Sequence, residues 1–219
     1  MHLQSTFILF RHFQTLDDRL RLHTPSEADP PFVTMDKANL DEMCSEMCKI
    51  VSFFEIKRVV TSDNIRGRRT AEMLTAEVAP ALPIYEDNRL RNMLQPEWAG
   101  LSYKEITSSE VYRIWHTTPE KALFTDGENL RDVDNRIKSL LDDLEDEPTL
   151  FVSHTTPLQV LGCNLLGIPA ENLWSFKYDF KKFTLIHRNT LLRFNSKHVS
   201  DADLGDLHVA VSFDGVQNA

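Results

Sequence analysis

Residues 7–15 read FILFRHFQT and place four apolar residues directly before an arginine and a histidine. A short, unbroken apolar run is typical of a strand that is buried on both faces of a parallel sheet. His12 therefore follows the carboxyl end of a predicted strand. Residues 149–154, TLFVSH, repeat this arrangement and place His154 after another predicted strand. Because the carboxyl ends of parallel strands meet at one edge of a sheet, we expect the two histidines to converge.

Further strands and helices alternate along the chain. Strands are predicted at 58–62, 82–85, 183–186 and 191–194, and the last two form a hairpin. Helical spacing of apolar residues predicts helices at 40–54, 66–78, 133–144 and 157–166. This order indicates a three-layer α/β/α sandwich with a mostly parallel central sheet. Residues 1–219 are expected to form a single domain with insertions near 16–35 and 88–129.

The composition limits the classes of function. The net charge is −9 at pH 7, whereas a general nucleic-acid binder needs a basic face. No apolar run is long enough to span a bilayer, which argues against a membrane protein. The cysteines Cys44, Cys48 and Cys163 are odd in number and do not form a disulfide framework, so they indicate a reducing, cytoplasmic compartment. We therefore expect neither nucleic-acid nor membrane partners.

A third polar segment follows the predicted strand at 58–62. Residues 61–71, TSDNIRGRRTA, place Arg66 at the start of a helix near the same sheet edge. A neutral imidazole is a good nucleophile near pH 7 when a hydrogen bond fixes its other nitrogen. Arginines and a second, protonated histidine can hold the charge on the phosphoryl oxygens. The segments together predict phosphoryl transfer with no metal ion or other cofactor.

These segments resemble the motifs of the histidine phosphatase superfamily, which includes the cofactor-dependent phosphoglycerate mutases. Residues 11–15 are similar to the family's motif of a strand followed by Arg-His-Gly-Glu/Gln-Thr, and residues 153–154 are similar to its motif of a strand followed by Ser-His. Residues 62–71 are similar to its Ser-x-x-x-Arg-Ala-x-x-Thr-Ala motif. Residues 127–129 are similar to its Gly-Glu-Ser motif. The resemblance extends from about Leu9 to Asn195. It implies a phosphoglycerate mutase-like fold.

The resemblance also implies roles for individual residues. His12 would be the nucleophile, and Arg11, Arg66 and His154 would form the phosphate pocket. The expected substrate-binding residues around this pocket are Gln14, Thr15, Asn92 and Thr155, with Thr15 as a hydroxyl donor.

The chain departs from the family pattern at three positions. Phe13 replaces the glycine after the first histidine, and Thr155 replaces the glycine often found after the second. Asn92 stands where the family has a glutamate that serves as the general acid. An amide cannot protonate a leaving alkoxide as a carboxylic acid does. Glu97 and Asp126 are the candidates for a substitute acid, and without one we expect aryl and acyl phosphates to be preferred over alkyl phosphates.

The leading prediction is a phosphatase that acts on a small phosphomonoester through a phosphohistidine. The alternatives are a pseudoenzyme that binds a phosphorylated ligand or partner, a phosphatase for phosphohistidine or acyl phosphates, and a phosphoglycerate mutase-type transferase. A homodimer is one assembly that the sequence leaves open. The histidines without motif context are interpreted as structural or surface residues: His23, His116, His187, His198 and His208. Trp98 and Trp115 are interpreted either as packing residues or as stacking partners for a substrate.

Overall fold

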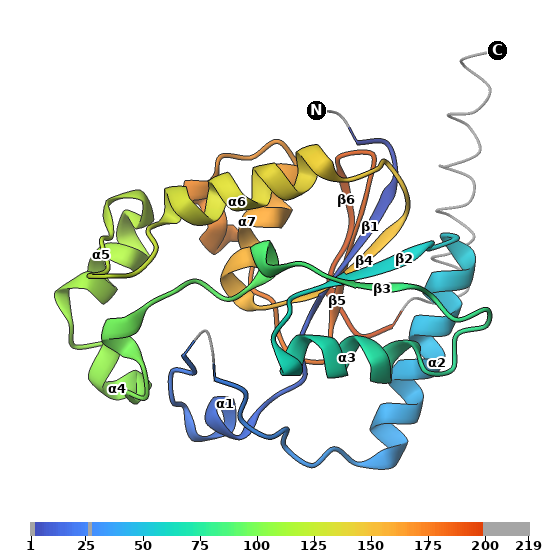
Figure 1. Ribbon diagram of the computed structural model, residues 1–219, viewed down its shortest axis with the longest axis horizontal. Coiled ribbons are helices and arrows are strands. Elements are labelled where there is room, and N and C mark those ends of the chain that lie inside the picture. Colours follow the sequence, from blue (N-terminus) through green and yellow to red (C-terminus); the bar gives the residue numbers. More distant parts are fainter. Residues whose placement is uncertain (1–2, 26–27, 199–219) are drawn as a thin grey trace.

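The computed structural model describes residues 3–25 and 28–198. A six-stranded sheet with the order β3-β2-β4-β1-β5-β6 lies at its centre (Figure 1). The strands are β1 (Thr6–Arg11), β2 (Arg58–Thr61), β3 (Ile84–Glu86), β4 (Thr149–Ser153), β5 (Phe183–His187) and β6 (Thr190–Ser196). The first four are parallel to one another, whereas β5 and β6 form the antiparallel hairpin. The predicted mostly parallel sheet is confirmed.

Helices cover both faces of the sheet (Figure 1). The helices α2 (Lys37–Phe53) and α3 (Ile65–Thr75) lie on one face, and α6 (Leu130–Asp143) and α7 (Thr155–Leu165) lie on the other. Alternate residues of β1 point to opposite faces. Ile8 and Phe10 belong to the hydrophobic cluster beneath α2 and α3, and Phe7 and Leu9 belong to the cluster beneath α6 and α7. Burial on both faces explains the unbroken apolar run of this strand.

The two segments expected as irregular insertions contain short helices. The first holds α1 (Leu16–Leu20). The second holds α4 (Tyr103–Ile106), α5 (Glu110–Thr117) and the 3-10 turns η1 (Asn88–Leu90), η2 (Pro96–Trp98) and η3 (Pro119–Lys121). The backbone amide of His23 donates to the Leu101 carbonyl at 2.9 Å, and Gly100 donates to the His23 carbonyl at 3.0 Å. The insertions therefore pair with each other beside the sheet.

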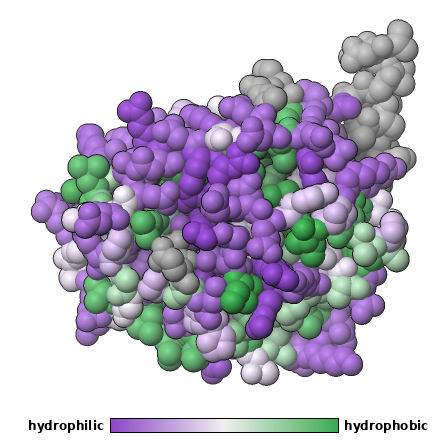
Figure 2. Space-filling model, viewed as in Figure 1, coloured by the Kyte–Doolittle hydropathy of each residue, from purple (hydrophilic) through white to green (hydrophobic). Residues whose placement is uncertain are grey.

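The surface of the molecule is mainly polar, as expected when the hydrophobic residues are buried in the two clusters on either side of the sheet. In Figure 2, polar side chains cover most of the visible face, and hydrophobic residues form small, separate groups among them. Within residues 3–25 and 28–198, no helix combines the length and apolar character needed to cross a membrane.

Candidate active site

His12 lies directly after β1 and is held by its neighbours on two sides. Its backbone amide donates to the Ser153 carbonyl at 2.9 Å. Its Nδ1 lies 2.7 Å from the Phe13 carbonyl oxygen. Because a carbonyl can only accept, Nδ1 carries the proton and Nε2 is left as the basic nitrogen. His12 is thus a neutral imidazole with a fixed tautomer, as a nitrogen nucleophile requires.

Phe13 does not fill the pocket, although it replaces a glycine of the family motif. Its ring lies 5.8 Å from the Phe10 ring and 6.1 Å from the Phe32 ring, within the cluster beneath α2 and α3. Its backbone amide donates to the Thr70 hydroxyl at 2.9 Å. The side chain anchors the loop in the core while the carbonyl orients His12.

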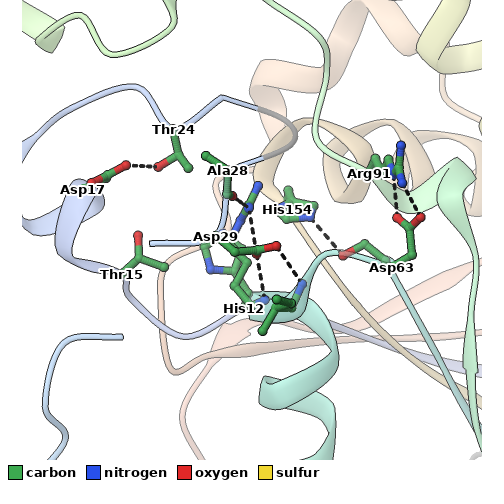
Figure 3. A network of polar contacts seen from close by, with 12 residues as sticks. His12, Thr15, Asp17, Thr24, Ala28, Asp29, Asp63, Arg91 and His154 are labelled. Carbon is green, nitrogen blue, oxygen red and sulfur yellow. Dashed lines mark hydrogen bonds and ion pairs between the residues drawn. The ribbon is translucent and has the colours of Figure 1, made fainter. Parts of the chain in front are cut away.

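His154 lies beside His12 at the start of α7. The two ring centroids are 4.9 Å apart, which is close enough for one phosphoryl group to contact both rings. Nε2 of His154 lies 3.0 Å from the Ser62 hydroxyl (Figure 3). Nδ1 is buried and has no hydrogen-bond partner among the described residues. A buried polar nitrogen without a partner is costly unless a ligand contacts it.

Arg66 is buried at the start of α3 and is tied to the first insertion. Its Nη1 donates to the Ala28 carbonyl and lies 3.2 Å from the Asp29 carboxylate. The same carboxylate accepts the backbone amides of Ile65 and Arg66 at 3.1 Å each (Figure 3). Asp29 therefore caps the helix, since the N-cap residue Asn64 makes no side-chain capping bond.

Arg11 is the second guanidinium at the site. Its Nη2 lies 3.1 Å from Oδ1 of Asp18, and its guanidinium carbon lies 3.7 Å above the centre of the Phe180 ring. Such a cation–π contact fixes the plane of the guanidinium. The site therefore presents two oriented arginines beside the two histidines.

A cavity of about 420 Å³ opens at this point. Among the residues for which the sequence suggested a role at the site, those that line it are Arg11, His12, Arg66, Asn92, His154 and Thr155, together with Trp98 and Trp115. The structure thus brings together the three separate segments that carry the histidines and arginines. Both tryptophans are buried and also face the cavity.

Four expected site residues do not line this cavity: Gln14, Thr15, Glu97 and Asp126. The Thr15 hydroxyl donates instead to Oδ2 of Asp18 at 2.6 Å and caps α1. Glu97 accepts the Thr125 backbone amide at 2.8 Å, and hydrogen bonds from the Thr125 side chain and backbone lower the pKa of its carboxyl. Asp126 is exposed in a turn with a φ of 53°. Neither proposed substitute acid is part of the cavity lining.

Several cavity residues were not identified from the sequence. The structure places Asp18, His23 and His116 in the lining, although His23 and His116 were interpreted as structural or surface residues. All three lie in the insertions, where the α-helices have eight residues or fewer and none was predicted from the sequence. The only available signal for Asp18 is its position three residues after Thr15, which is typical of a capping box.

Burial and positive neighbours control the protonation of both histidines. Burial lowers the pKa of His12, and the charges of Arg11 and Arg66 lower it further. Burial also lowers the pKa of His154, as do the neighbouring His12 ring and the charge of Arg66. Both rings are therefore neutral near pH 7 in the free protein. The protonated second histidine expected from the sequence requires an anion that raises its pKa.

These shifts predict that stability depends on pH. An unfolded histidine takes up a proton below about pH 6.5, whereas His12 and His154 stay neutral while folded. The unfolded state then binds more protons, so stability falls as the pH falls. Between about pH 7 and pH 5, we expect a loss of about 2 kcal/mol from His12 and a further loss in the same direction from His154, measured by urea unfolding without phosphate.

The matched control is the double variant His12→Gln/His154→Gln. His23 also has a pKa lowered by burial, to about 4, but it is present in both proteins and its effect cancels from the difference. The double variant should lose clearly less stability over this range. Equal losses in the two proteins would contradict the assignment of neutral, buried histidines.

Comparison with known proteins agrees with this geometry. The model of the histidine phosphatase superfamily (branch 1) matches residues 7–191. The chain is 33% identical over 135 residues to phosphoserine phosphatase 1 of Hydrogenobacter thermophilus, covering 56% of this chain and 64% of that protein. It is 26% identical over 151 residues to adenosylcobalamin/alpha-ribazole phosphatase of Escherichia coli, covering 64% and 73%. The match with the first of these relatives spans less than two thirds of its length.

A solved structure shows the same fold. The putative alpha-ribazole-5'-P phosphatase from Escherichia coli superposes with a TM-score of 0.74 at 23% identity. The match covers 90% of this chain and 98% of that chain.

Proposed function

This chain belongs to the histidine phosphatase superfamily, and we propose that it hydrolyses a small phosphomonoester through a phosphohistidine on His12. The observation that carries this proposal is the fixed tautomer of His12. Its Nδ1 is committed to the Phe13 carbonyl at 2.7 Å, which leaves Nε2 available in a cavity with two arginines. The relatives described above carry phosphatase names, which supports hydrolysis over transfer to a second substrate.

The reaction has two steps in this proposal. Nε2 of His12 attacks the phosphorus and displaces the alcohol, and water then attacks the phosphohistidine. Arg11 and Arg66 hold the phosphoryl oxygens, and His154 contributes its buried Nδ1. Preorganised donors of this kind stabilise the charge that is spread over the three oxygens in the transition state.

A phosphate-binding pseudoenzyme is the second candidate, and Asn92 in the cavity favours it. A panel of phosphorylated metabolites, assayed by phosphate release, separates the two. Turnover of at least one small phosphomonoester supports the phosphatase. Binding of phosphate ligands without release of phosphate from any of them supports the pseudoenzyme.

We expect turnover to be independent of divalent metal ions. The two guanidinium groups already supply the positive charge that a metal ion would bring to the phosphoryl oxygens. Activity should be unchanged after dialysis against EDTA and should not rise when Mg²⁺, Mn²⁺ or Zn²⁺ is added. Loss of activity in EDTA with recovery on addition of one metal would contradict this account.

We also propose a cytoplasmic location. Cys44, Cys48 and Cys163 are all free thiols. Unpaired cysteines are typical of proteins in a reducing compartment.

A further inference from the structure

The cavity contains an asparagine where the reaction needs a proton donor. An alkoxide leaves poorly unless a neighbouring group protonates it. Asn92 lines the cavity, but its amide is not an acid. Glu97 and Asp126 do not line it. The carboxylates that do are Asp18 and Asp179, and they differ sharply in their surroundings.

Asp18 is held against Arg11, the residue that precedes the proposed nucleophile. Its Oδ2 accepts the Thr15 hydroxyl at 2.6 Å and the Thr15 backbone amide at 2.9 Å. Its Oδ1 lies 3.1 Å from Nη2 of Arg11. The side chain is 15% exposed, and its charge acts on both His12 and Arg66. One oxygen therefore fixes the orientation of the carboxyl group, and the other contacts an arginine of the phosphate pocket.

Asp179 is committed to contacts outside the pocket. Its carboxylate lies 2.9 Å from Nζ of Lys182 and accepts the Asn195 amide at 3.0 Å. Its side chain is 36% exposed. Asp179 is therefore more exposed than Asp18, and the partners that hold it, Lys182 and Asn195, do not line the cavity.

We propose that Asp18 is the proton donor to the leaving oxygen, taking the part that Asn92 cannot play. This inference rests on the proposed phosphatase function and names a further catalytic residue for it. Asp18 comes from the first insertion, whereas Asn92 comes from the second. The two residues therefore come from different segments of the chain, and both line the cavity.

The charges in the cavity support this assignment. A carboxylate and a phosphoryl oxygen that contact each other need a shared proton, because two anionic oxygens repel. A phosphomonoester has a second pKa near 6, so its monoanion is available at neutral pH. A substrate monoanion with an Asp18 carboxylate holds the same number of protons as a dianion with an Asp18 carboxylic acid. Binding can therefore place the proton on Asp18.

The two steps then balance. In the first, the N–P bond to Nε2 of His12 forms, the P–O bond breaks, and the leaving oxygen takes the Asp18 proton and departs as the alcohol. In the second, the Asp18 carboxylate takes a proton from water while the water oxygen bonds to phosphorus. The N–P bond breaks, and its electron pair returns to His12. Inorganic phosphate leaves, and Asp18 is protonated again.

The test compares leaving groups in native protein and Asp18→Asn. The substrates are p-nitrophenyl phosphate, whose leaving group needs little acid help, and phosphoserine or glycerol phosphate, whose alkoxides need it. For Asp18→Asn we expect alkyl kcat/KM to fall by about 10²–10⁴-fold, the usual contribution of a general acid. Aryl kcat/KM should fall by no more than about tenfold. Asp179→Asn is the matched control, and its alkyl-to-aryl ratio should not change.

A second variant moves the carboxyl group from position 18 to position 92. Asp18→Asn/Asn92→Glu should recover alkyl turnover, because it restores one carboxyl group to the cavity, whereas Asn92→Glu alone should raise the alkyl rate little. Equal loss of aryl and alkyl turnover in Asp18→Asn would overturn the proposal, since it would show that Asp18 only positions Arg11. Aryl turnover with negligible alkyl turnover in the native protein would also overturn it. Turnover of neither class would instead refute the proposed function itself.

Discussion

His12→Ala is expected to abolish turnover, with kcat reduced by at least about 10⁴-fold, as for other covalent nucleophiles. The remaining cavity would keep both arginines and His154, so phosphate binding should survive. The phosphoryl group would then have no nitrogen to attack it. Steady-state rates with an aryl phosphate and equilibrium binding of inorganic phosphate measure the two effects separately.

The same variant tests the covalent intermediate. A brief pulse with an activated phosphate donor should add one phosphoryl group to His12, as located by mass spectrometry. The bond is a phosphoramidate, labile in acid and more durable in base, so samples are quenched in base. His198→Ala serves as the control, because His198 is 56% exposed and pairs with Glu42 away from the cavity. Labelling that persists in His12→Ala would show that another residue is the nucleophile.

The strands and the principal helices were predictable because their burial leaves a regular pattern. The strand predicted from Thr149 begins at the same residue as β4, and its apolar residues are buried on both faces of the sheet. The amphipathic helix predicted at 133–144 corresponds to α6, which spans Leu130–Asp143. The unbroken apolar run of β4 records burial on both faces, whereas the helical period of α6 records which side faces the core.

The convergence of the two histidines was predictable for the same reason. Each follows a parallel strand, and the register pairs Arg11 of β1 with Ser153 of β4. The residues that come next, His12 and His154, therefore lie at one edge. Topology alone brings these groups together, without detailed knowledge of loop structure.

The walls of the cavity could not be predicted in this way. The helix α5 spans only eight residues and was not predicted from the sequence, and α1 has no buried residue. The orientation of Asp18 depends on the capping box with Thr15, and that of Asp29 depends on the start of α3. Such contacts are long-range or specific to one turn. These contacts place Thr15 in the cap of α1 and Asp18 in the lining of the cavity.

Arg66→Ala should produce the second large loss. Arg66 is 2% exposed, and its guanidinium is oriented by the Ala28 carbonyl and the Asp29 carboxylate. Removal of a buried, oriented cation from a phosphoryl-transfer site typically costs about 10³-fold or more in rate. We expect kcat/KM to fall by at least about 10³-fold for aryl and alkyl phosphates alike. Equal loss for both classes distinguishes charge stabilisation from proton donation.

A matched control variant distinguishes the effect of the Arg66 charge on phosphate from the role of Arg66 in anchoring the first insertion. Asp29→Asn keeps the Arg66 cation and the shape of the side chain but removes the negative charge that competes with phosphate for Arg66. Its kcat/KM should stay within about tenfold of the native value, and inorganic phosphate should bind at least as tightly. If Asp29→Asn were instead as damaging as Arg66→Ala, the role of Arg66 would be to hold the insertion in place. The Asp29 carboxylate contacts both the Arg66 guanidinium and the first two backbone amides of α3. Comparison of the two variants therefore distinguishes charge stabilisation by Arg66 from anchoring of the insertion.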